Sequence, residues 1–286
     1  NKSPTKELIT QSDNASISNL HFQVDKIKVG KTDIELPFPS GFVKVDDSMD
    51  NLLEAAKKLC PKTNTLLAYY ISEEDYANYL VDENHVCEKY ILVQVFNDLK
   101  DINVGAKDYR QFLKKHKEEY IDEFKLQIDD AEIKASENLS KINERLKMKD
   151  LKMEPFGICY ESKYSLSYGI LTKYNFTVDY ENSGDYIVAG ISTITKIDKK
   201  PIFLFLYKTY NGSEDIQSLK ALNTSWIEEI DKRQSPGSFL AEIDFEDYKE
   251  SILAILTLSF IWAIYFATKK IHRKLKNRPE KKVAQV

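Results

Sequence analysis

Short apolar runs and amphipathic stripes alternate along the first 100 residues and predict a domain of mixed strands and helices. The runs TLLAYYI and YILVQVF are rich in β-branched and aromatic residues, which is typical of strands with buried faces. Ser48 precedes a stripe of apolar residues at helical spacing and Pro61 follows it, so a helix is expected between them. The predicted strands are 31–37, 65–71 and 90–96, and the predicted helices are 48–59 and 73–80.

The stretch 106–151 contains neither glycine nor proline, and its apolar residues recur every three or four positions among many lysines and glutamates. This spacing predicts one long helix, or two helices broken near 131–136. Because its length exceeds that of most globular helices, part of it should project from the domain. The projecting part carries the predicted partner surface, which consists of Tyr120, Phe124, Ile128 and Ile133. The alternative is a solvated face stabilised by ion pairs.

Four further apolar runs, joined by short polar turns, predict an antiparallel meander. The run KPIFLFLYKTY is almost wholly apolar, which is typical of a central strand. A stripe of apolar residues that includes Trp226 predicts a closing helix that Ser213 can cap. The predicted strands are 156–160, 165–178, 186–197 and 201–210, and the helix is 213–230. The expected fold class is α+β: a mainly antiparallel sheet flanked by helices, with the long helix as an insert.

Seventeen uncharged residues, 252–268, follow this domain, and a basic segment comes directly after them. A helix of this length is at the lower limit for crossing a hydrocarbon core of about 30 Å, and the long side chains of Lys269 and Lys270 can extend its span. The alternative is a buried core helix of a soluble domain, but such a helix normally carries a polar face. The sequence therefore predicts one C-terminal transmembrane helix.

The charges on the two sides of this helix predict its orientation. Residues 236–251 contain one lysine, whereas the tail 269–286 contains eight lysines and arginines. Positive charge is retained on the cytoplasmic side, so the tail should be cytoplasmic. A tail-anchored protein with a cytosolic domain is the poorer alternative. We expect a single-pass protein of a bacterial inner membrane, with a flexible leader (1–26), a periplasmic domain (27–235) and a juxtamembrane segment (236–251).

Charge and composition narrow the function further. Residues 1–268 carry 33 lysines and arginines against 44 aspartates and glutamates, a net charge of −11. Such an acidic domain lacks the basic surface that nucleic acids require. Five Asn-x-Ser/Thr triplets would suggest glycans in a secreted eukaryotic protein, but two lie in predicted regular structure, which favours a bacterial protein. An exported domain needs a signal peptide, which we expect to have been removed before Asn1 or left out of the numbering.

The three cysteines show neither a disulfide framework nor metal-ligand spacing. In an oxidising compartment the first candidate disulfide is Cys60–Cys87, with Cys159 as a buried free thiol. His85 and Cys87 could form a nucleophile pair, but no third, orienting group is evident. The sequence also lacks a glycine-rich phosphate loop, a GxSxG elbow and an HExxH motif. We therefore predict no catalytic site, no cofactor and no metal.

Three features carry a family resemblance: the turn Pro39-Ser40-Gly41-Phe42, the KPIFLFLYKTY strand and the helix around Trp226. In their order along the chain they resemble the Mog1/PsbP-type α/β sandwich. Members of that fold are mostly non-catalytic binding or assembly modules. The resemblance thus implies a non-catalytic module that binds a partner or takes part in assembly. Together with the transmembrane helix predicted above, this leads us to expect a membrane-anchored periplasmic domain that binds a protein partner or helps to assemble an envelope complex. The alternatives are an envelope hydrolase with an unrecognised site and a structural tether.

Overall fold

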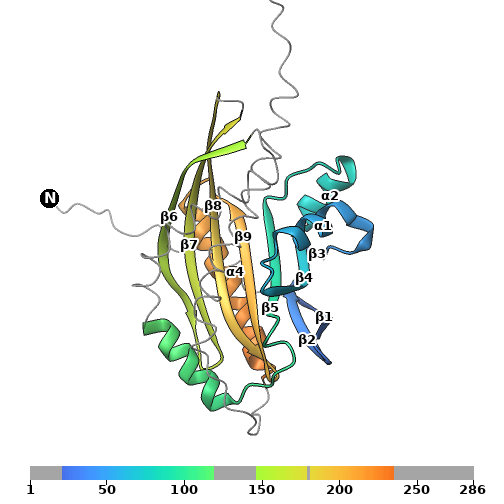
Figure 1. Ribbon diagram of the computed structural model, residues 1–286, viewed down its shortest axis with the longest axis vertical. Helices are drawn as coiled ribbons and strands as arrows, with labels where there is room; N and C mark the ends of the chain where they lie inside the picture. The colour runs from blue at the N-terminus through green and yellow to red at the C-terminus, as the bar shows by residue number, and fades with distance from the viewer. Residues whose placement is uncertain (1–20, 119–145, 179–180, 235–286) are drawn as a thin grey trace, which may run out of the picture.

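The computed structural model describes residues 21–118, 146–178 and 181–234 (Figure 1). Its strands are β1 (Phe22–Val29), β2 (Thr32–Pro39), β3 (Phe42–Lys44), β4 (Asn64–Ser72), β5 (Lys89–Phe96), β6 (Leu146–Glu161), β7 (Ser165–Val178), β8 (Glu181–Ile197) and β9 (Lys200–Thr209). The helices are a 3-10 turn η1 (Asp47–Met49), α1 (Asp50–Leu59), α2 (Glu73–Val81), a helix over 106–118 and α4 (Ser213–Lys232).

Seven strands form one sheet in the order β3-β4-β5-β9-β8-β7-β6, and every neighbouring pair is antiparallel. β9 lies at the centre of this order, as its apolar sequence predicts, and nine of its ten residues are buried. The β1–β2 hairpin forms a separate two-stranded sheet. The α+β class and the mainly antiparallel sheet are therefore confirmed.

Helices cover opposite faces of the sheet, as the neighbouring residues Ser167 and Tyr168 of β7 show. Consecutive strand residues point to opposite faces. On one face Ser167 hydrogen-bonds Thr193 (Oγ to Oγ1, 2.7 Å), whose hydroxyl donates to Asn223 of α4 (3.1 Å). On the other face the Tyr168 ring lies edge-on to His116 of the helix over 106–118, with centroids 5.7 Å apart. In Figure 1, α4 runs along one face of β6 to β9, while the helix over 106–118 lies at one end of the sheet.

Trp226 ties α4 to the hairpin. Its side chain is fully buried, and its indole Nε1–H donates to the carbonyl oxygen of Pro37 in β2 at 2.6 Å. The stripe predicted for this helix is buried at Leu219, Leu222 and Ile230, whereas Ile216 is only partly buried. The closing helix therefore packs against both the main sheet and β2.

Three expectations need correction or lie beyond the described residues. β1 begins at Phe22, inside the predicted leader, because the pairing of β1 with β2 organises residues whose side chains are mostly not buried. Residues 146–151 belong to β6, so the predicted long helix does not reach 151; their partners are residues 174–178 of β7. The partner surface of Tyr120, Phe124, Ile128 and Ile133 lies outside the described residues.

The predicted transmembrane segment, 252–268, also lies outside the described residues. Within the described part of the chain, no helix has the length and apolar character needed to cross a membrane.

The two edge strands of the seven-stranded sheet are irregular or short. β6 is the outermost strand on one side, and its pairing with β7 shifts register at three places. It also contains Pro155, and Gly157 has a φ of +94°. On the other side the outermost strand, β3, has only three residues.

Gly30 opens the two-residue turn between β1 and β2 with a φ of +60°, whereas Gly41 has a φ of +86° in open space. A methyl group on Gly30 would overlap Oδ1 of Asp101 and the carbonyl oxygen of Lys100. Gly41→Ala should lower the free energy of unfolding by about 1–2 kcal/mol from backbone strain alone. Gly30→Ala should lower it by about 1–3 kcal/mol more, because steric overlap adds to that strain. Urea unfolding followed by circular dichroism measures both, and equal losses would contradict the close approach at Gly30.

Candidate functional site

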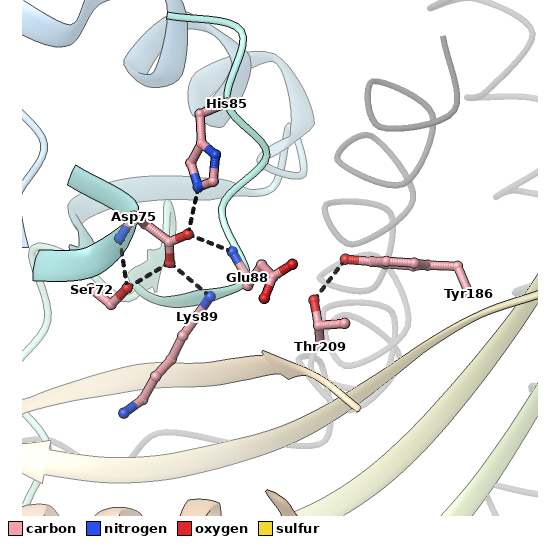
Figure 2. A network of polar contacts seen from close by, with 7 residues as sticks. All are labelled: Ser72, Asp75, His85, Glu88, Lys89, Tyr186 and Thr209. Atoms are coloured by element: carbon pink, nitrogen blue, oxygen red, sulfur yellow. Dashed lines mark hydrogen bonds and ion pairs between the residues drawn. The ribbon is translucent and has the colours of Figure 1, made fainter. Parts of the chain in front are cut away.

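Asp75, in the first turn of α2, accepts four hydrogen bonds (Figure 2). Its Oδ1 accepts hydrogen bonds from His85 Nε2 (2.9 Å) and from the backbone N–H of Glu88 (2.9 Å). Its Oδ2 accepts from Ser72 Oγ (2.6 Å) and from the backbone N–H of Lys89 (3.0 Å). Asp75 is only 2% exposed. We call Asp75 and these four partners the Asp75 hub.

The local sequence explains why the hub forms. Ser72 is the N-cap of α2, and its Oγ accepts the backbone N–H of Asp75 at 3.1 Å. Serine followed three residues later by an acidic residue is a helix-start pattern, and the negative charge suits the positive end of the helix dipole. The loop after α2 then returns His85 to the carboxylate and leads into β5.

Hydrogen bonding keeps the hub carboxylate ionised. Burial raises the pKa of Asp75, but the hydrogen bonds from His85, Ser72 and the two backbone N–H groups outweigh it, so the pKa lies below its usual value. Because an ionised carboxylate only accepts hydrogen bonds, His85 must carry a proton on Nε2. Asp75 is therefore a charged acceptor with four donors around it.

The order of groups in the hub favours a structural role over nucleophilic catalysis. In a serine triad the histidine lies between the serine and the carboxylate, so that it can remove the hydroxyl proton. Here Ser72 and His85 both bond to Asp75, and Ser72 donates its proton to the carboxylate. The hub thus joins the start of α2 to the start of β5.

The His85–Cys87 pair considered from the sequence is not what the structure brings together. His85 Nε2 is engaged by Asp75, while Cys87 is buried in the core at 1% exposure. The hub is instead the residue set that sequence analysis missed. The Ser72-x-x-Asp75 pattern was the available sequence signal for the hub. No pattern predicts the contact of His85 with Asp75, because the conformation of the loop after α2 determines it.

The three cysteines are free thiols, so the predicted Cys60–Cys87 disulfide is not formed. The antiparallel register gives the reason. Cys60 lies just before Asn64, which pairs with Phe96 at the far end of β5, whereas Cys87 lies just before the first residue of β5. The two positions are thus separated by the length of the strand pair, roughly 20 Å, and a disulfide needs Cα atoms within about 7 Å.

Burial makes the thiols of Cys60 and Cys159 poor nucleophiles. It raises the pKa of Cys60 to about 12 and that of Cys159 to about 11, so both stay protonated at neutral pH. Within the described ranges, no group of three or more histidine, cysteine, aspartate and glutamate side chains could hold a metal ion.

A second carboxylate, Asp231 near the end of α4, is also surrounded by hydroxyl donors. It accepts hydrogen bonds from Ser162 Oγ (2.5 Å), Ser165 Oγ (2.7 Å) and Tyr160 OH (3.1 Å). These donors come from the end of β6, the β6–β7 turn and the start of β7, 66 to 71 residues away in sequence. Asp231 therefore fastens α4 to the β6–β7 turn, and no local sequence pattern predicts it.

The comparisons with known proteins give a weak similarity of fold. No family model and no curated protein matches the chain. Among solved structures, the Ran-binding protein Mog1p of Saccharomyces cerevisiae is 10% identical, with a TM-score of 0.33, over 74% of this chain and 95% of that one. A Mog1 point mutant is 12% identical, with a TM-score of 0.35, over 74% and 94%. PsbP from the cyanobacterium Synechocystis is 11% identical, with a TM-score of 0.28, over 79% and 96%.

The resemblance predicted from the order of elements is thus supported as a weak Mog1/PsbP-like fold. At TM-scores this low, the similarity carries no argument about function.

The far end of α2 is the most conspicuous apolar surface of the described residues. Leu80 is 67% exposed and Val81 is 88% exposed, which makes them the two most exposed large hydrophobic side chains there. On the inner side of the same helix Tyr79 is buried, and Tyr76 is partly buried one turn before Leu80. Figure 1 shows α2 at a corner of the molecule, away from the helix over 106–118.

Proposed function

We propose that this chain is a non-catalytic binding module, anchored in a bacterial inner membrane, that binds a protein partner on the periplasmic side. The observation that carries the proposal is the exposed apolar end of α2, formed by Leu80 and Val81. When a partner covers two adjacent apolar side chains that are exposed to water, the complex is stabilised by about 25 cal/mol for each Å² of apolar surface buried. Single exposed hydrophobic residues are common on protein surfaces, whereas adjacent ones form a patch that a partner can cover.

The Asp75 hub supports this function because it fixes the opposite end of α2. Its four hydrogen bonds hold the first turn of the helix against the start of β5. A rigid helix presents Leu80 and Val81 in one arrangement, which reduces the entropy lost on binding. Asp82 and Glu83 follow directly, so a partner with an apolar patch beside basic residues would be complementary.

The bonding of the polar groups supports binding rather than catalysis. Ser72 and His85 are both committed to Asp75, and Ser162 and Ser165 are both committed to Asp231. Neither site therefore has the serine–histidine–carboxylate order of a hydrolytic triad. The membrane part of the proposal is supported by the uncharged run 252–268 and the eight basic residues after it.

A photo-crosslinking amino acid in place of Val81 should give a discrete adduct with one protein in intact cells, because Val81 lies in the proposed contact. The same amino acid at Ile158, which is 44% exposed on β6, is the control and should give no such adduct. Leu80→Glu should remove the Val81 adduct without changing the thermal unfolding of the domain. Immunoblotting and mass spectrometry identify the adducts.

Three results would contradict this assignment. Equal crosslinking from positions 81 and 158 would show that the α2 end is not a specific surface. Adducts from Tyr120 or Phe124 alone would move the contact to the surface predicted from sequence. A hydrolytic activity that His85→Ala removes would replace binding by catalysis.

A further inference from the structure

A pocket of about 460 Å³ lies between the helix over 106–118 and the turn that joins β6 to β7. Leu113 and Leu166 line it and are 6% and 1% exposed, so they provide a buried apolar surface. Three cations of the lining, Arg110, Lys114 and Lys117, belong to the helix. Their spacing of four and three residues places them on one helix face.

The fourth cation, Lys163, comes from the β6–β7 turn, so the pocket is cationic on both sides. The Lys163 ammonium lies 4.7 Å from the centroid of the Tyr164 ring, which keeps the charge without neutralising it. The volume falls in the range of small-ligand pockets, and an apolar wall with a few charged groups is their usual composition.

Two carboxylates also line the pocket, and each has a lysine partner. Lys117 Nζ lies 2.7 Å from Glu161 Oε2, and Lys114 Nζ lies 3.9 Å from Glu118 Oε1. Within the described part of the chain, Arg110 and Lys163 have no carboxylate partner. Among the described lining residues, four cations against two carboxylates leave an excess of two positive charges, which matches the charge of a phosphate monoester near neutral pH.

We propose that this pocket binds a phosphate monoester that carries a short apolar group. Arg110 offers a planar fork of donors to the phosphate oxygens, and Lys163 adds a point charge from the opposite side. Leu113 and Leu166 cover the apolar group. This surface differs from the end of α2, so the inference stands apart from the proposed function.

We assign the pocket to binding because Ser162, which carries the one hydroxyl among the described lining residues, is already fully hydrogen-bonded. Ser162 Oγ donates to Asp231 at 2.5 Å and accepts the backbone N–H groups of Tyr164 (3.1 Å) and Ser165 (3.0 Å). Because both lone pairs of the Ser162 oxygen accept backbone N–H groups, none is left to attack a bound ester. The bound ester is therefore expected to leave unchanged.

Isothermal titration calorimetry on the full chain in phosphatidylcholine nanodiscs tests the proposal with hexyl phosphate as the ligand. Inorganic phosphate, which lacks the apolar group, should bind about tenfold or more weakly. Combining Arg110→Glu with Lys163→Glu should weaken hexyl phosphate binding by about 100-fold, because two charged contacts become repulsive. Lys107→Glu reverses one charge on the same helix as Arg110 but outside the pocket, and should leave the affinity unchanged.

Hexyl phosphate binding that the double variant retains, or no binding by the unmodified chain, would overturn the proposal. Equal affinities for hexyl phosphate and inorganic phosphate would overturn the role of the two leucines. Thermal unfolding followed by circular dichroism checks that each variant is folded. If the double variant is not, Arg110→Gln replaces it, and this variant should bind about tenfold more weakly.

Discussion

Trp226→Ala should lower the free energy of unfolding by about 3–5 kcal/mol, because it removes the largest fully buried side chain and leaves a cavity between α4 and the hairpin. It also leaves the carbonyl oxygen of Pro37 without the 2.6 Å indole donor. Urea unfolding followed by far-ultraviolet circular dichroism is the appropriate measurement, since Trp226 is itself one of only two tryptophan fluorophores in the chain.

Trp226→Phe separates the two contributions. It retains an aromatic ring but cannot donate to Pro37, so its loss should be near 1–3 kcal/mol, the usual effect of leaving a buried acceptor unsatisfied. If Trp226→Ala lowers the free energy of unfolding by less than about 1 kcal/mol, no cavity has formed, and α4 does not pack on the sheet and hairpin as described.

Asp75→Asn should lower the free energy of unfolding at neutral pH by about 2–4 kcal/mol, because an amide cannot accept from all four donors of the hub. The NH2 group of the asparagine would face the backbone N–H of Glu88 or of Lys89, both of which donate to the carboxylate in the unmodified chain. The control is Asp46→Asn. Asp46 likewise accepts from the side chain and backbone of a serine, but it is exposed, so its replacement should matter far less.

The same variant predicts a pH dependence. The folded pKa of Asp75 lies below its ordinary value, so the carboxylate contributes stability above the unfolded pKa, which is about 3.9. That contribution is lost as the pH falls through the folded pKa. The stability difference between the unmodified chain and Asp75→Asn should therefore be full at pH 7 and shrink below about pH 4. A difference that stays constant down to pH 2 would show that the hub carboxylate is not ionised.

The sequence predicted those elements whose own residues are enough to define them. The strand 165–178 has the bounds of β7, because apolar and β-branched residues fill it and polar turns flank it. β1 was missed because only Ile27 and Val29 of its eight side chains are buried, which gives a weak apolar pattern. Residues 146–151 resemble a helix in composition, and their strand conformation depends on pairing with 174–178.

The polar sites were less predictable for the same physical reason. In the hub, Asp75 meets donors up to 14 positions away, and Asp231 meets donors more than 60 positions away. Except for the local Ser72–Asp75 pair, these contacts exist only after the sheet has formed, so no motif or spacing predicts them. The α2 end was overlooked because Leu80 and Val81 look like ordinary core residues in sequence, and only the fold turns them to solvent.

The irregular edge strands of the seven-stranded sheet limit how copies of this domain can pair with one another. A sheet grows between molecules when two long, regular edge strands align their free backbone groups. β3 offers only three residues, and β6 combines Pro155 with three breaks in register. Proline and bulges interrupt the row of donors and acceptors that a second copy would need. Fibre-like stacking of copies through these two edges is thereby disfavoured.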